Sequence, residues 1–323
     1  IPIPNDKVVS KGRLGPGQII AINLDKGKVF NSKSIKDHIS KDYKKYNKQI
    51  IDLDKKFSIS KEKFIYSGDE LRRRQYLAGI NIEDLELILH PMVEEEKEAV
   101  GSMGDDTPLA VLSGNYRPLS HFFRQNFSQV TNPPIDSLRE KVVMSLRTRI
   151  GNLSNILDEN EKQCNHLQLN SPILSINQFK TMRKYMGDNV KILDTTFEKN
   201  INKFSFKNEL DRINKEAEDA VRSGLSHIIL TDKNISPMHI PLPMILATSS
   251  VHHHLINQNL RTFISLNVQS AECLDVQYFA VLIGVGATSV NAYKAVSCTS
   301  GAVKVGEIAV ELDKMIPEGD DQP

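Results

Sequence analysis

The second half of the chain alternates between apolar, strand-like runs and amphipathic helical segments, and this order limits the possible folds more than any other feature. The strand-like runs stand roughly every 25 to 37 residues, at 191–197, 226–232, 262–268 and 289–293. Helices are predicted before and between them, at 176–186, 207–223, 241–259 and 275–285. Nearly continuous apolar runs are typical of parallel strands covered on both faces. The pattern predicts an α/β fold of repeated βα units, and both a (β/α) barrel and a doubly wound sheet satisfy it.

The N-terminal segment has a different character. Residues 17–30 predict two strands joined by a turn around Gly27, and a hairpin of this size is not stable alone. The Lys-, Asp- and Ser-rich segment that follows, from Ser32 to about Lys63, predicts a surface helix and a connector. We therefore expect a small β-hairpin and helix appendage over residues 1–66 and a main domain over residues 67–323.

Residues 134–151 form an amphipathic stretch at the start of the alternating part of the chain. The stretch predicts a helix with Asp136 as its N-cap and Gly151 just beyond its end. Its apolar positions share one helical face: Ile135, Leu138, Val142, Leu146 and Ile150.

Composition excludes several classes of protein. The 323 residues include 41 basic and 40 acidic ones, so no global field favours nucleic acid or an anionic membrane. No apolar run approaches the roughly 20 residues that a bilayer span needs. The three cysteines, Cys164, Cys273 and Cys298, are too few and too scattered for a zinc ribbon or a four-cysteine cluster. They indicate a reducing, cytoplasmic setting. Because residue 1 is Ile, we expect the chain to be part of a longer polypeptide.

Polar residues follow three of the strand-like runs. In βα folds ligands bind beyond the carboxyl ends of the strands, which makes Asp194, Asp232 and Glu272 candidates for a small-ligand site. The chain lacks a nucleophile elbow, an HExxH pair and a Walker loop. An autonomous βα enzyme and a domain without its own active site both remain open.

Two further motifs suggest ligands but fit structural roles better. GVGATSV at 284–290 follows a predicted helix and lacks the third glycine of a dinucleotide fingerprint, so we expect a helix-to-strand turn. His252, His253 and His254 are consecutive, and side chains that diverge by about 100° per residue do not converge on one ion. We expect packing and hydrogen bonding at a helix surface, and no metal site.

Two stiff corners lie in the middle of the chain. Asp105 and Asp106 follow a glycine and precede Thr107, a turn context in which carboxylates cap loop amides and make a poor cation site. Thr131 and Asn132 precede two prolines, which impose an extended backbone. Such corners suit the wall of a passage or a contact between domains.

Long stretches of the chain resemble one family. GSMGDDTPLAVLS, FRQNFSQVTNPPIDSLREKVVMSLRTRIG, SVHHHLINQNLRT and FAVLIGVGATSVNAY are similar to the central domain of the glutamate synthase large (alpha) subunit. KGRLGPGQIIAINLDKGKVF resembles the tail of that subunit's N-terminal amidotransferase region. The resemblance covers nearly the whole chain. One departure is that the family's usual VESGE is VQSAE here, at 268–272.

The resemblance implies an oxidoreductase that acts on CH-NH2 donors and forms glutamate from 2-oxoglutarate and glutamine-derived ammonia. In that family an FMN barrel with a 3Fe-4S cluster performs the reduction, with electrons from FAD and NAD(P)H or from ferredoxin. It implies that this chain, inactive and without a cofactor of its own, links the amidotransferase and FMN domains as a degenerate (β/α) barrel. Thr131 and Asn132 would help to wall the ammonia route, and Asp105, Asp106 and Thr107 would contact neighbouring domains. A small subunit or ferredoxin would be the partner, in the cytoplasm or in a eukaryotic organelle.

Overall fold

The computed structural model describes residues 3–43, 50–57, 68–77, 79–95, 118–123, 130, 133–155, 157, 166–199 and 203–293. The chain divides into two compact units, Ile1–Ile50 and Ile51–Pro323. Among the described residues, no helix combines the length and the apolarity needed to cross a bilayer.

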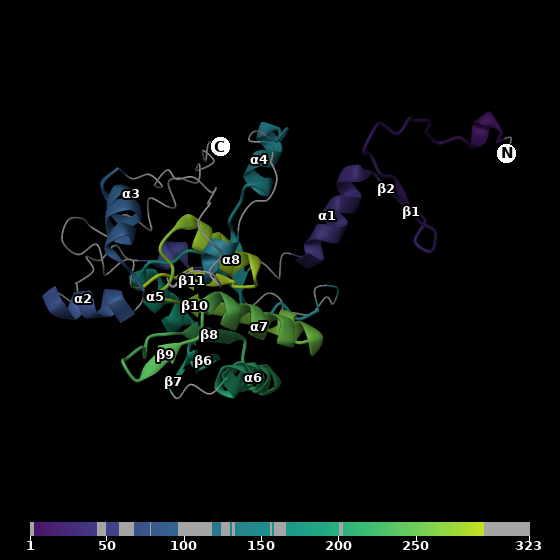
Figure 1. Ribbon diagram of the computed structural model, residues 1–323. Helices are drawn as coiled ribbons and strands as arrows, with labels where there is room; N and C mark the ends of the chain where they lie inside the picture. Colours follow the sequence, from purple (N-terminus) through teal and green to yellow (C-terminus); the bar gives the residue numbers. More distant parts are fainter. Residues whose placement is uncertain are drawn as a thin grey trace. The chain divides into compact units, whose positions relative to one another are not determined.

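The first unit is a β-hairpin followed by a helix (Figure 1). Its elements are a 3-10 turn (Asn5–Lys7), β1 (Ala21–Asn23), β2 (Lys28–Phe30) and α1 (Ser32–Tyr43). β1 and β2 pair antiparallel, and Gly27 adopts the positive φ of 57° that the turn requires. Asn31 caps α1 by accepting a hydrogen bond from the Ser34 amide. The predicted hairpin and helix are confirmed, and no described residue of this unit is buried.

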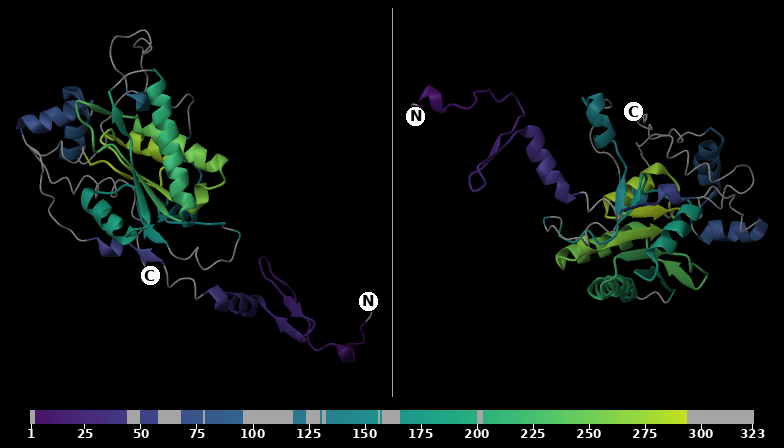
Figure 2. Two further views of the ribbon diagram at one scale, coloured as in Figure 1. Left: turned by 90° about the horizontal axis from the view of Figure 1, so that it is seen from below. Right: turned by 180° about the vertical axis from the view of Figure 1, so that it is seen from behind.

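A parallel sheet of four strands organises the second unit, in the order β11-β10-β8-β6 (Figure 1, with two further views in Figure 2). The strands are β6 (Val190–Asp194), β8 (His227–Thr231), β10 (Ser265–Gln269) and β11 (Ser289–Asn291). The helices that connect them are α6 (Lys203–Arg222), α7 (Met244–Asn257) and α8 (Val276–Gly284). Strands that follow one another in the chain are neighbours in the sheet, with a helix between each pair. The predicted βα units are confirmed.

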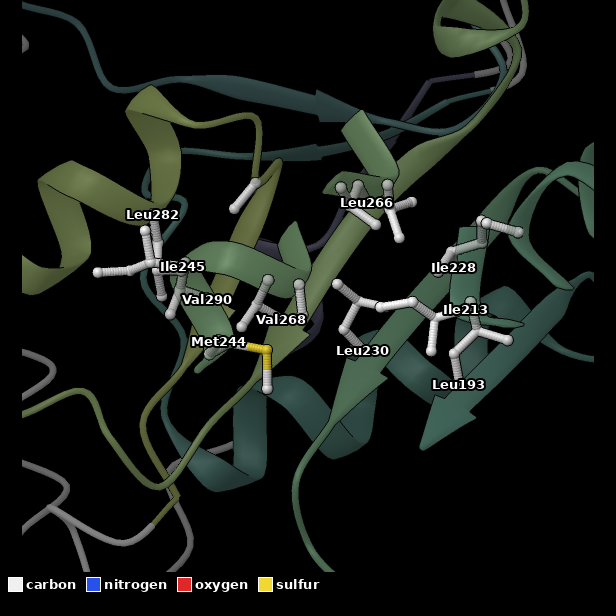
Figure 3. Close-up of a cluster of buried hydrophobic side chains, with 14 of the residues drawn as sticks. Leu193, Ile213, Ile228, Leu230, Met244, Ile245, Leu266, Val268, Leu282 and Val290 are labelled. Carbon is white, nitrogen blue, oxygen red and sulfur yellow. The ribbon is translucent and has the colours of Figure 1, made fainter. Parts of the chain in front are cut away.

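The larger core lies between this sheet and the three connecting helices. Side chains of alternate strand residues point to one face and meet apolar residues of α6, α7 and α8. Figure 3 labels the central contacts, which involve Leu193, Ile213, Ile228, Leu230, Met244, Ile245, Leu266, Val268, Leu282 and Val290. Complete burial of one such side chain contributes about 1.5–3 kcal/mol, so this face supplies much of the driving force for folding.

The opposite face of the sheet is covered by α5 (Ile176–Met186). Ile229 of β8 points away from the helices that contact Ile228 and Leu230, and it joins a second core with Met182 of α5. This core also receives residues from a small sheet of β3 (Ile51–Asp52), β5 (Leu167–Leu169) and β4 (Thr148–Ile150). The strands β8, β10 and β11 are therefore covered on both faces, as the strand sequences predict, whereas Ile192 on the α5 face of β6 is 52% exposed.

The α/β class and the parallel sheet are thus confirmed, whereas the described strands form open sheets. Ile173 extends the four-stranded sheet by one parallel bridge to Val290, beyond β11. Within the described ranges, β6 has no strand partner on its other side that would close a ring. A complete barrel is not seen in this part of the chain.

The helix predicted over residues 134–151 is wrong in its second half. α4 covers only Ser137–Val143, although Asp136 is its N-cap as predicted and accepts hydrogen bonds from two amides of the first turn. Residues 148–150 instead form β4, which pairs antiparallel with β5 and buries Ile150 completely. Pairing with a distant strand outweighs the local helical spacing here.

Short elements complete the second unit. Before the sheet these are η3 (Asp54–Lys56), α2 (Gly68–Leu77), the π-helical η4 (Asp84–Leu89), α3 (His90–Glu94) and η6 (Leu119–Phe122). Within it are β7 (Thr196–Glu198), which pairs antiparallel with β9 (His239–Pro241), and η8 (Arg261–Phe263). The turn that opens η4 is closed by reciprocal side-chain to amide hydrogen bonds between Asn81 and Asp84.

Candidate functional site

Asp232, directly after β8, is a fully buried carboxylate with protein donors on both oxygens. It accepts hydrogen bonds from the Ala271 amide at 2.8 Å, the Ser270 hydroxyl at 3.0 Å and the Tyr293 hydroxyl at 2.8 Å. Ser270 and Ala271 follow β10, and Tyr293 follows β11. Asp232 thus joins the segments that leave three adjacent strands, which fits a bracing role at this edge of the sheet.

Glu272 belongs to the same cluster and closes the amino end of α7. Its Oε2 accepts a hydrogen bond from the Met244 amide at 3.1 Å and another from the Tyr278 hydroxyl of α8. Burial raises the pKa of Glu272 to about 7, the charge of Asp232 acts in the same direction, and the two hydrogen bonds oppose the rise. Two carboxyls from different strand ends are therefore brought together.

Asp194, the third predicted strand-end residue, lies in a separate group of contacts at the end of β6. Its carboxylate accepts hydrogen bonds from the Thr196 amide at 2.8 Å and the Asn234 side chain at 2.6 Å. Arg212 of α6 donates to the Asp194 carbonyl at 2.9 Å. These bonds hold the bend between β6 and β7, which divides the run predicted as one strand.

The edge lacks the features of a nucleophilic site. Cys273 is buried completely, and burial raises the pKa of its thiol well above the usual value, so the reactive thiolate is disfavoured. The described residues contain no group of three or more His, Cys, Asp and Glu side chains that could hold a metal ion. The hydrogen bonds of Asp232 and Glu272 instead suit a structural role, in which these carboxyls hold the loops that follow the strands in place.

Sequence reasoning missed a buried polar network on the α5 side of the sheet. Four pairs of side chains from neighbouring strands are hydrogen bonded: His227 with Ser265, Thr231 with Gln269, Asn267 with Ser289, and Gln269 with Asn291. The signal was present, because polar residues alternate with apolar ones along β10, whereas the strands were interpreted as continuously apolar. The tyrosines that bind Asp232 and Glu272 carried no comparable signal.

The three histidines point to separate partners, as expected for a helix surface. His252 accepts a hydrogen bond from Arg261, His253 bonds to Ser249 one turn earlier in α7, and His254 pairs with Glu218 of α6 at 2.8 Å. Burial lowers the pKa of His252, and the nearby Arg261 charge lowers it further.

GVGATSV forms the turn from α8 to β11, so the helix-to-strand prediction is confirmed. Gly286 has a φ of 117°, and a Cβ there would overlap the His252 ring. Arg261 donates to the Gly286 carbonyl at 2.7 Å and to the Ile264 carbonyl at 2.8 Å. Glycine at position 286 therefore allows the backbone to lie close to the His252 side chain.

The other candidates, Asp105, Asp106, Thr107, Thr131 and Asn132, lie outside the residues that the structure describes.

Known proteins match the chain over most of its length. The sequence model described as "Glutamate synthase central domain" matches residues 73–319, and the one described as "Glutamine amidotransferases class-II" matches residues 1–48. The glutamate synthase [NADPH] large chain of Azospirillum brasilense is 55% identical over 300 residues, which are 91% of this chain and 20% of that protein. The glutamate synthase [NADH] of Saccharomyces cerevisiae is 36% identical, over 91% of this chain and 14% of that protein.

Ferredoxin-dependent glutamate synthase 2, chloroplastic, of Arabidopsis thaliana is 36% identical, over 90% of this chain and 18% of that protein. The chain thus spans about a fifth or less of the length of these relatives. Since the central-domain match covers most of the 323 residues, the chain belongs to the glutamate synthase central domain family.

Proposed function

We propose that this chain is the connecting part of a glutamate synthase large chain. The enzyme uses ammonia from glutamine to convert 2-oxoglutarate reductively to glutamate, and this segment joins its amidotransferase domain to its flavin domain. The observation that carries the proposal is that a class-II amidotransferase match and a central-domain match follow one another in a single chain. The functional division would lie near residue 66, with 1–66 belonging to the amidotransferase region and 67–323 to the central domain.

The role of the segment in this proposal is architectural. The strand-end carboxylates Asp194, Asp232 and Glu272 already accept hydrogen bonds from the protein, which supports bracing over catalysis. FMN and the 3Fe-4S cluster would be held elsewhere in the large chain. Relatives are named for NADPH, NADH or ferredoxin, so the electron donor would reach the flavin domain directly or through a small subunit. The enzyme would work in the cytoplasm, or in an organelle in a eukaryote.

The sheet would correspond to part of a degenerate (β/α) barrel. Parallel strands in chain order, each joined to the next by a helix on the same face, are the repeating unit of such a barrel.

Thr131 and Asn132 would help to wall the ammonia route. Free ammonia must be kept from bulk water, where it protonates, so the wall needs stiff backbone and neutral hydrogen-bonding groups. A Thr and an Asn followed by two prolines supply both. The carboxylates of Asp105 and Asp106 would favour ammonium over ammonia, so they would not line the route. Together with Thr107 they would stabilise a loop that contacts a neighbouring domain.

The test is the Thr131→Val variant of the complete large chain. We expect normal folding and glutamine hydrolysis but less glutamate formed per glutamine hydrolysed, because valine keeps the shape and removes the hydroxyl. Thr131→Ser is the matched control, since it keeps the hydroxyl. Unchanged coupling in the valine variant at normal stability would remove Thr131 from the route.

An autonomous enzyme is the second candidate, and the observation that favours it is Glu272. A partly buried carboxyl with a pKa of about 7 near a second carboxyl has the properties of a general acid or base. Thermal unfolding of the 323-residue chain with 2-oxoglutarate, glutamine, glutamate or FMN separates the two candidates. A ligand at 100 times its Kd stabilises the native state by about 2.7 kcal/mol, whereas the connecting role predicts an unchanged Tm with all four.

A further inference from the structure

The carboxylate of Asp232 lies in a cradle of hydrogen-bond donors that other segments of the chain supply. The Ala271 amide donates to both of its oxygens, at 3.1 Å to Oδ1 and at 2.8 Å to Oδ2. The Tyr293 hydroxyl donates to Oδ1 at 2.8 Å, and the Ser270 hydroxyl donates to Oδ2 at 3.0 Å. Asp232, Ser270 and Ala271 are completely buried. Because a carboxylate removed from water needs such donors, the three residues of this donor cradle suit a planar anion.

The donors are held in place by hydrogen bonds that do not involve the Asp232 carboxylate. The Ser270 amide donates to the Asn291 carbonyl at 3.0 Å, which ties the loop after β10 to β11. The Ser270 hydroxyl accepts a hydrogen bond from the Glu272 amide at 3.1 Å, which leaves its proton for the carboxylate. The turn after β8 is closed by the Ile235 amide, which donates to the Asp232 carbonyl at 3.2 Å. Removal of the Asp232 carboxyl group should therefore leave the donors and the backbone in position.

We propose that the donor cradle is a binding site for a small carboxylate, and that this chain fills the site from within by Asp232. In folds built of βα units, anions bind beyond the carboxyl ends of the strands, where loop amides point at the ligand. The cradle has that position, because Ser270 and Ala271 follow β10 and Tyr293 follows β11. A side chain that follows the third strand, β8, takes the place of the ligand. The proposal goes beyond the connecting role and does not depend on it.

Occupation by Asp232 closes a polar edge of the sheet to external carboxylates. A group attached to the same chain reaches an effective concentration that a free solute does not reach, so a free carboxylate does not displace it. The charge of Asp232 already raises the pKa of the neighbouring Glu272, and a further anion at this edge would be repelled in the same way. The native chain should therefore leave the cradle to its own side chain.

The test removes the internal ligand and supplies a free one. Asp232→Ala keeps the Cβ atom and deletes the carboxyl group, so formate has the size of the missing part. We expect the variant to have a lower Tm than wild type in sodium chloride, and sodium formate at the same ionic strength to raise that Tm in a saturable way. At ten times its Kd, formate increases the folding equilibrium constant about elevenfold. Wild type should gain nothing from formate, because its cradle is already filled.

Two further variants show whether the response belongs to the cradle. Asp232→Ala/Ser270→Ala lacks one of the donors and should lose most of the gain in Tm that formate gives to Asp232→Ala. Asp194→Ala is the matched control, because it also removes a carboxylate at a strand end. Asp194 is only partly buried, so water can replace its carboxylate and formate should have no specific effect.

Equal Tm values of Asp232→Ala in formate and in chloride would overturn the proposal. The same gain in all four proteins would be a general salt effect and would overturn it as well. If the alanine variant does not fold, Asp232→Asn decides, because it keeps the shape and loses the charge. The loss of charge-assisted hydrogen bonds should lower its folding equilibrium constant at least about tenfold, whereas wild-type stability of the Asn variant would show that the cradle does not require an anion.

Discussion

Replacing Glu272 by Gln isolates the energetic effect of a partly buried carboxyl at the amino end of α7. The amide oxygen of Gln can still accept the hydrogen bonds from the Met244 amide and the Tyr278 hydroxyl, so the change mainly removes the ionisable proton. The native carboxyl has a pKa of about 7, raised by burial from its ordinary value of 4.5. Its native state therefore binds the proton more tightly than the unfolded chain does.

The sign of the pH dependence follows from linkage. Glu272 contributes stability that is complete below its unfolded pKa and is lost as the pH rises through its folded pKa. The interval from 4.5 to about 7 corresponds to about 3 kcal/mol, lost between these two values. His227 acts in the opposite direction, because burial lowers its pKa from 6.5 to about 4 and its contribution grows as the pH rises between these values. Comparison of wild type with variant at each pH removes the His227 contribution.

Urea unfolding of both proteins near pH 4.5 and near pH 8 measures the difference. Wild type should lose about 3 kcal/mol more than Glu272→Gln over this range, so the variant should gain relative stability as the pH rises. Glu83→Gln makes the same chemical change at an exposed helical position and serves as the control. Parallel pH profiles for wild type and Glu272→Gln would refute the argument that burial of this carboxyl governs its protonation.

Three further substitutions test the packing of the second unit. Gly286→Ala should cost at least about 2 kcal/mol and lower the Tm by several degrees, because the φ of 117° is strained for alanine and its methyl group would overlap His252; an unchanged Tm would contradict this. Asn267→Leu should cost about 1–3 kcal/mol in urea unfolding by leaving the buried Ser289 hydroxyl without its acceptor, and a neutral result would mean that the strand rearranges. Leu230→Ala should cost about 2–5 kcal/mol through the cavity it leaves, with a lower urea midpoint and an unchanged m value; a larger m would instead indicate an altered denatured state.

Local patterns in the sequence predicted those elements whose causes are local. The β-hairpin with Gly27, the N-cap at Asp136 and the order of βα units each depend on residues within one or two turns of the chain. Predictions failed where the deciding partner is remote. Residues 148–150 continue the helical spacing but pair with β5. Local propensity contains no information about that distant strand.

The sequence predicted where the strand-end carboxylates lie, but it did not predict which groups they bind. The strand-end positions of Asp232 and Glu272 predicted that the two would lie near one another, because parallel strands place their carboxyl ends together, and they do. The partners of Asp232 and Glu272 come from β10, β11, α7 and α8, and only the fold brings those segments to one place. Carboxylates available for chemistry and carboxylates occupied by bracing bonds look alike in a sequence.

The buried polar pairs also decide which alignment of the strands is allowed. Because side chains alternate with a period of two, sliding β10 by two residues past β8 and β11 would keep its apolar residues toward the helices. The core facing α6, α7 and α8 therefore discriminates poorly against such a slip. The slip would separate Asn267 from Ser289 and Gln269 from Asn291, which are direct partners across the strands, so the buried polar side chains would lose the partners that they have in this alignment. The apolar face holds the sheet together, and the polar pairs add a preference for the observed alignment that hydrophobic burial alone does not supply.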